Sequence, residues 1–102
     1  MSYDLESEVK RKCKNWLDKN GWFNPNIHNQ GFYCHKGIAD KIAIKGGRVV
    51  MIEFKTMSKK SVQSDDQIIF QERWEEKGGE YIVVRSVEEL QEKLEGIRQV
   101  TL

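Results

Sequence analysis

Hydrophobic and polar positions along the chain predict three helices and four extended segments. Apolar residues three and four apart over residues 3–20 predict an amphipathic helix. Asn20-Gly21 would end this helix, because glycine favours the position just past a last turn. The predicted apolar stripe consists of Leu5, Val9, Cys13, Trp16 and Leu17. The chain is therefore expected to begin with a helix that packs one face on a core.

Residues 38–55 predict a β-hairpin. Two apolar runs rich in β-branched residues flank Gly46-Gly47, a pair typical of a two-residue hairpin turn. Pairing residue by residue outward from this turn places Asp40 directly opposite Glu53. Lys55 follows two residues later and shares a face with Glu53, because side chains alternate along a strand.

Like charges opposite each other on an antiparallel pair lie about 5 Å apart and repel. Two carboxylates and an ammonium group at the open end of an apolar hairpin therefore indicate a metal site. The alternative is that Asp40, Glu53 and Lys55 are solvated residues of an edge hairpin. That alternative fits Glu53 poorly, because the strand around it is apolar enough to be buried on both faces.

The remaining pattern completes a mixed sheet. Residues 22–27 predict a short extended segment, in which proline favours an edge or irregular path. Residues 65–77 predict a helix with Ser64 as its N-cap, residues 81–84 a buried strand, and a capping box at residues 86–89 opens a last helix to about Leu94. The predicted order is αβββαβα: a small mixed sheet flanked by helices, with a parallel β-α-β crossover.

Composition restricts the class of protein. The chain has 102 residues, enough for one compact domain, which we expect to be residues 1–102, and a net charge of +1. No apolar run approaches the ~20 residues of a membrane span and no signal peptide opens the chain, so we expect no membrane partner and a cytoplasmic location. We expect the three tryptophans, Trp16, Trp22 and Trp74, to belong to the core rather than to a base-stacking platform.

Cysteines and local charge give weaker signals. Cys13 and Cys34 form neither a CxxC motif nor a disulfide framework, and with His28 and His35 they match no zinc spacing. Two basic clusters favour a phosphate-facing side, although a solvated helix face explains the first equally well. They are Lys10, Arg11, Lys12 and Lys14, and Lys55, Lys59 and Lys60.

The first helix also carries acids. Glu6 lies at helical spacing from Val9 and Cys13, so it is expected to share the buried stripe, whereas Glu8 aligns with the polar face. The alternative is that these acids favour the positive end of the helix dipole, an explanation that fits Glu8 better than Glu6.

Two loops and a helix start could contact a substrate. Residues 28–37 are polar, aromatic and punctuated by glycine, and residues 56–64 form a lysine-bearing loop. Gln67, early on the following helix, is expected close to Lys55. The candidates for DNA contact are His35, Lys36, Lys59, Lys60 and Ser64.

Four short motifs in fixed order resemble the PD-(D/E)xK nuclease superfamily, and specifically its virus-type replication-repair nuclease (VRR-NUC) branch. They are the early glutamate on the first helix, Gly37-Ile38-Ala39-Asp40, Ile52-Glu53-Phe54-Lys55, and Ser64-Asp65-Asp66-Gln67. The tail is similar as well, at Gly78-Gly79-Glu80-Tyr81 and Ser86-Val87-Glu88-Glu89, so the resemblance covers nearly the whole chain. It departs at Ala39, where the family usually has proline, a change that leaves the chemistry intact.

The resemblance implies a divalent-metal-dependent DNA nuclease. It implies that Asp40, Glu53 and the backbone carbonyl of Phe54 hold Mg²⁺ or Mn²⁺, with Glu6 bound directly or through water and Glu8 in reserve. Hard oxygen ligands suit these ions rather than zinc. Lys55 would position or activate the attacking water, and Gln67 would orient Lys55 or that water.

The resemblance further implies a homodimer that cuts branched DNA, such as Holliday junctions or flaps, in replication and repair of phage or prophage DNA. Three alternatives remain open: a catalytically silent DNA-binding module, a restriction-type duplex endonuclease, and a metal-independent phosphate-binding protein. The lack of extra recognition elements disfavours the restriction-type enzyme.

Overall fold

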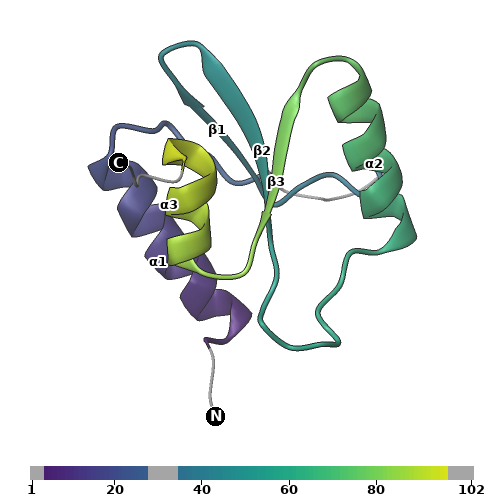
Figure 1. Ribbon diagram of the computed structural model, residues 1–102, viewed down its shortest axis with the longest axis horizontal. Coiled ribbons are helices and arrows are strands. Elements are labelled where there is room, and N and C mark those ends of the chain that lie inside the picture. The colour runs from purple at the N-terminus through teal and green to yellow at the C-terminus, as the bar shows by residue number, and fades with distance from the viewer. Residues whose placement is uncertain (1–3, 28–34, 97–102) are drawn as a thin grey trace, which may run out of the picture.

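A computed structural model describes residues 4–27 and 35–96 as a three-stranded sheet with three helices (Figure 1). The elements in chain order are α1 (Glu6–Lys19), β1 (Lys41–Lys45), β2 (Arg48–Phe54), α2 (Asp65–Glu76), β3 (Glu80–Val84) and α3 (Val87–Glu95). None of the described helices has the length and apolar character needed to cross a membrane.

The sheet has the order β1-β2-β3 and confirms both predicted pairings. β1 and β2 are antiparallel, and their register runs from Lys45 opposite Arg48 to Lys41 opposite Ile52. The turn residues Gly46 and Gly47 both have positive φ, at 59° and 84°, as a type I′ hairpin turn requires. β2 and β3 are parallel, as expected for strands joined by a helical crossover.

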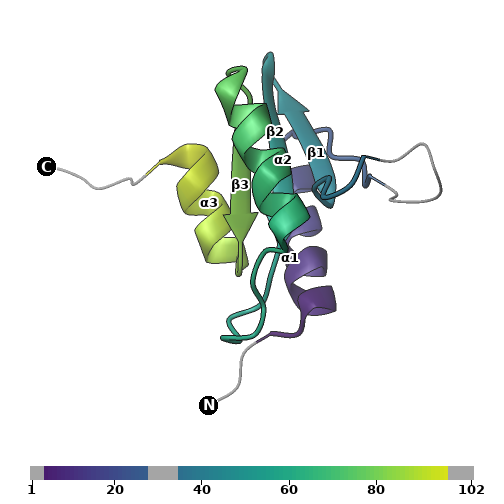
Figure 2. The same cartoon turned by 90° about the vertical axis from the view of Figure 1, so that its right-hand side faces the viewer.

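Helices cover both faces of the sheet. α1 and α3 lie side by side on one face, and α2 lies on the other (Figures 1 and 2). Because side chains alternate along β2, the larger core cluster takes Val50, Ile52 and Phe54 on the α1–α3 face. Met51 points to the α2 face, where it packs with Tyr81. The tryptophans belong to these clusters, as predicted.

The extended segment predicted at residues 22–27 does not form a regular strand. Residues 22–27 pair with β1 only through two isolated bridges, Phe23 with Ile44 and Asn26 with Lys41. Pro25 lies between the bridges and has no N–H to donate, although its carbonyl accepts a hydrogen bond from Ile42. The segment therefore runs along the edge, as expected, and the observed order is αββαβα.

The N-cap residues predicted for α2 and α3 are confirmed. Ser64 caps α2 in a full capping box with Gln67, and Ser86 caps α3 by accepting the N–H of Glu89. The Glu89 carboxylate accepts the N–H of Arg85 instead of that of the cap residue. On α1, Val9, Cys13 and Leu17 are buried as predicted. Leu5 is 70% exposed, so its place in the stripe is wrong: it precedes the first helical turn.

Candidate active site

The hairpin brings Asp40 and Glu53 to its open end. Ile42 lies opposite Met51, and both pack in the cluster on the α2 face. Asp40 and Glu53 each lie two residues further towards the open end, at the bend that precedes β1 and near the end of β2. The observed register runs as far as Lys41 opposite Ile52, one step before the Asp40–Glu53 pair inferred from the glycine turn.

Asp40 is held by the backbone of the strand opposite. Its Oδ2 accepts the N–H of Phe54 at 2.8 Å, which fixes the carboxylate beside the end of β2. Its Oδ1 lies 4.0 Å from Lys10 Nζ on α1. One oxygen of Asp40 is thus tied to the backbone, and the other faces the cationic side of α1.

Glu53 is fully buried, with 0% of its surface exposed. Its Oε1 accepts hydrogen bonds from the Tyr81 hydroxyl and from Gln63 Nε2, the latter at 3.2 Å. Its Oε2 has no hydrogen-bond partner among the described residues, although Lys55 Nζ lies at ion-pair distance, 3.4 Å. A buried carboxylate oxygen in this state is costly unless a cation completes its surroundings.

The pKa of Tyr81 is raised well above its ordinary value. Burial is the main cause, and the hydrogen bond to Glu53 and its negative charge add to it, with a smaller contribution from the charge of Asp40. The phenol therefore remains protonated and donates to Glu53.

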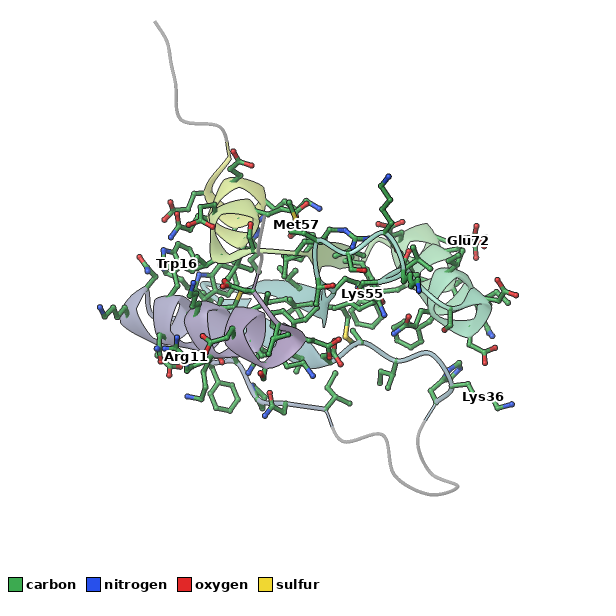
Figure 3. All side chains as sticks on the ribbon, turned by 90° about the horizontal axis from the view of Figure 1, so that it is seen from below. Arg11, Trp16, Lys36, Lys55, Met57 and Glu72 are labelled. Atoms are coloured by element: carbon green, nitrogen blue, oxygen red, sulfur yellow. The ribbon has the colours of Figure 1, made fainter. Side chains whose placement is uncertain are left out.

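Lys55 follows directly after β2 and lies between α1 and α2 (Figure 3). Its backbone N–H donates to Val84 O at 2.9 Å, which continues the pairing with β3 past the last residue of β2. Its side chain is 15% exposed, so the ammonium lies close to Glu53 while retaining a path to solvent.

Glu6 does not share the buried stripe, contrary to the prediction. Its side chain is exposed and pairs with Lys10 at 3.1 Å. Within residues 4–27 and 35–96, no three His, Cys, Asp or Glu side chains gather as a metal site. Lys10 lies near both Glu6 and Asp40 and links them electrostatically.

Gln67 is engaged elsewhere than expected. Its Oε1 accepts the N–H of Ser64 at 2.9 Å, so its side chain completes the capping box of α2. Gln63, which sequence reasoning missed, is the glutamine that reaches Glu53, and it also donates to Gln71 at 2.9 Å. No periodicity marks Gln63, because it lies in an irregular segment just before the helix cap.

A pocket of about 470 Å³ opens beside Asp40 and Phe54. Its α1 wall carries Lys10, Arg11 and Lys14, three members of the first basic cluster. Lys12, the fourth, pairs with Asp4 at 2.8 Å instead. The exposed guanidinium of Arg11 lies on this wall (Figure 3). The cluster therefore forms the cationic side of a pocket that contains one of the two site carboxylates.

The predicted DNA-contact residues lie at several places. Lys36, Lys59 and Lys60 are exposed, whereas the ring of His35 packs edge-on against Phe70, with centroids 5.4 Å apart. The hydroxyl of Ser64 is used by its own helix, where it accepts the Gln67 N–H. The substrate-contact prediction for residues 28–34 lies outside the described residues.

The loop that carries Lys59 and Lys60 is anchored at both sides. The Arg85 guanidinium donates to the carbonyl oxygens of Thr56 and Ser61, the latter at 2.7 Å. Thr56 also donates its N–H to Ser61 Oγ at 2.8 Å. These bonds close the loop immediately after Lys55.

Cys13 lies in the hydrophobic core rather than in a metal cluster. Burial raises the pKa of its thiol to about 12, which keeps it protonated at neutral pH. Of the other residues in the zinc set, His28 and Cys34 lie outside the described residues, and His35 packs against Phe70.

Comparison with known proteins identifies the fold. No protein-family model matches the sequence, and neither does any curated protein. Among solved structures, the chain is similar to one described as a "VRR_NUC domain", with a TM-score of 0.73 and 17% identity over 91% of this chain and 97% of that chain. The chain therefore has the fold of a VRR-NUC domain, an α/β fold with a small mixed sheet, in agreement with the resemblance inferred from its sequence.

Proposed function

We propose that this chain is a VRR-NUC nuclease domain that hydrolyses phosphodiester bonds of branched DNA with the help of a divalent metal ion. The observation that carries the proposal is the end of the hairpin, where Asp40, the buried Glu53 and Lys55 converge. The fold supports it, because a domain described as VRR_NUC has the same architecture.

The residues present fit a hard divalent cation. Glu53 Oε2 is buried without a hydrogen-bond partner among the described residues, and the second oxygen of Asp40 lies 4.0 Å from the Lys10 ammonium. Asp40, Glu53 and the carbonyl of Phe54 would hold Mg²⁺ or Mn²⁺, which prefer oxygen ligands and retain several waters. Such an ion supplies charge neutralisation at the scissile phosphate and a more acidic bound water.

The protein's own groups complete the arrangement. The Lys55 ammonium, held near Glu53 yet open to solvent, would donate a hydrogen bond to the attacking water or to a phosphate oxygen that gains charge. Glu6 would act through a water, because Lys10 already connects it to the charge of Asp40. Gln67 would contribute through α2, whose N-terminus it caps, rather than by contact with Lys55.

The pocket beside Asp40 supports DNA as the substrate. Its three α1 cations would contact backbone phosphates next to the bond that is cut. His35, Lys36, Lys59 and Lys60 are further candidates, and Ser64 could contribute only with the part of its hydroxyl that the helix does not use.

We further expect a homodimer, one site for each strand of a branched substrate. A single domain of this size offers little surface to grip two duplexes. Light scattering at micromolar concentration measures this directly. A monomeric mass with and without junction DNA would remove the dimer from the proposal.

The first test is cleavage of a labelled four-way junction beside a linear duplex of the same sequence, with Mg²⁺, Mn²⁺ or EDTA. We expect junction cleavage with Mg²⁺ or Mn²⁺, none with EDTA, and a loss of at least about 100-fold in Lys55→Ala, in line with the removal of one transition-state donor. Lys19→Ala is the matched control, because it removes an exposed lysine of α1 that does not line the pocket.

The outcomes separate the alternatives. Junction binding without cleavage in any metal would favour a catalytically silent module. Equal cleavage of the linear duplex would retain the nuclease and remove the junction preference.

A further inference from the structure

Two side chains to which the sequence motifs assigned no role hold the buried glutamate of the site. Tyr81, on β3, and Gln63, just before α2, both donate to the same oxygen of Glu53, Oε1. The other oxygen, Oε2, receives no hydrogen bond from the described residues and lies 3.4 Å from Lys55 Nζ. The two oxygens of the Glu53 carboxylate therefore have different surroundings.

The fold places these donors from two separate elements. In the parallel register of β2 and β3, Tyr81 lies opposite Met51, two residues before the partner of Glu53, so its side chain points to the same face as Glu53. Gln63 approaches from the loop side and is itself oriented by Gln71 on α2, whose Oε1 accepts its second N–H. Tyr81 on the sheet and Gln63 in the loop before α2 together fix the position of Oε1.

A carboxylate held by one oxygen cannot rotate freely, so its second oxygen has a fixed direction. Both donors are neutral, and they satisfy Oε1 without neutralising the charge of the group. The negative charge thus remains available to a cation at Oε2. Oriented partners of this kind commonly change metal affinity by about 10- to 100-fold when they are removed.

We propose that Tyr81 and Gln63 are positioning residues that clamp Oε1 of Glu53 and thereby direct Oε2 towards the divalent cation and Lys55. The inference rests on the proposed metal-dependent function and extends it to two residues to which the resemblance assigned no role. In a merely structural role, the same hydrogen bonds would stabilise a buried carboxylate without affecting how tightly the site binds metal.

The test measures Mn²⁺ binding to the full chain by titration calorimetry, at a temperature where circular dichroism shows each variant folded. We expect Tyr81→Phe and Gln63→Leu each to weaken Mn²⁺ binding by about 10-fold or more. Trp74→Phe is the matched control, because it removes a hydrogen bond to Glu80 O in the same packed cluster without touching Glu53. It should retain the wild-type affinity within about 2-fold, a margin small beside the expected loss.

The results distinguish this inference from the proposed function. If wild type binds Mn²⁺ and cuts the junction while both folded variants bind Mn²⁺ like wild type, the clamp is wrong and the nuclease stands. If wild type binds no divalent metal, the proposed metal site and the clamp are both overturned. Gln63 lies in a loop, so its variant remains informative even if Tyr81→Phe fails to fold.

Discussion

At the residue scale, Gly37 controls the approach of the chain to Asp40. Its φ is +77°, in the region that favours glycine, and a Cβ added there would lie 2.2 Å from the carbonyl oxygen of Asp66. This close approach fixes the segment before Asp40 against the first turn of α2. The glycine that opens the GIxD motif therefore has a steric reason to be there.

We expect Gly37→Ala to destabilise the protein more than Gly46→Ala. Both positions have positive φ, which costs about 1–3 kcal/mol for a residue with a Cβ, but nothing described lies within 4 Å of a Cβ at Gly46. The difference between the two urea-unfolding free energies thus reports the contact with Asp66. Equal losses in the two variants would show that the backbone of α2 shifts freely to admit a methyl group.

The sequence was sufficient to predict the hairpin and its register, because a glycine turn determines which residues lie opposite each other. The roles of Asp40, Glu53 and Lys55 stay predictions. The sequence was not sufficient for Glu6, which lies in the unpacked first turn of α1 beside the exposed Leu5. Lys41 is buried, although its charged side chain would favour solvent. Its Nζ donates to Asn24 O at 2.5 Å, and burial lowers its pKa.

At the element scale, α2 depends on its cap more than the other helices do. None of its twelve residues, all of them described, is fully buried, and Ile68 and Ile69 are exposed. Its packing rests on the partly buried Phe70 and Trp74, which stack with ring planes 13° apart. A helix with so little buried surface gains a larger share of its stability from the capping box at Ser64.

We expect Ser64→Ala to cost about 1 kcal/mol of unfolding free energy, the usual value for loss of an N-cap side chain. Ser64→Asn should retain most of the stability, because asparagine also accepts the Gln67 N–H. Urea unfolding of the three proteins measures both. A loss as large in Ser64→Asn as in Ser64→Ala would show that the hydroxyl acts through something other than the cap.

Elements with strong local sequence signals were predictable, whereas those whose structure depends on pairing with other elements were not. The hairpin, the crossover and the caps follow from turn residues and hydrophobic spacing. Residues 22–27 also have strand-like composition, yet Pro25 interrupts their pairing with β1 to two bridges. Gln67 lies at the motif position, and its side chain completes the capping box of α2, a use that the motif does not indicate.

At the scale of the whole molecule, a net charge of +1 hides a strongly uneven distribution. The pocket beside Asp40 gathers cations from α1, while α2 begins with two acids in its first turn. Arg11 and Lys14 on the pocket wall pair with Glu8 and Asp18, but both pairs are exposed. Exposed pairs contribute only about 0–1 kcal/mol, so a phosphate can replace the carboxylate partner.

We therefore expect DNA binding to depend on salt through this pocket rather than through the overall charge. Arg11→Ala and Lys14→Ala should each make the plot of log K against log salt shallower by about one unit, the effect of one lost phosphate contact. Lys19→Ala, on the same helix but outside the pocket, should leave the slope unchanged. Fluorescence anisotropy of a labelled junction in EDTA, over a range of salt concentrations, measures all three without cleavage. Equal slopes in all variants would show that the DNA binds another face and that Arg11 and Lys14 keep their ion pairs with Glu8 and Asp18.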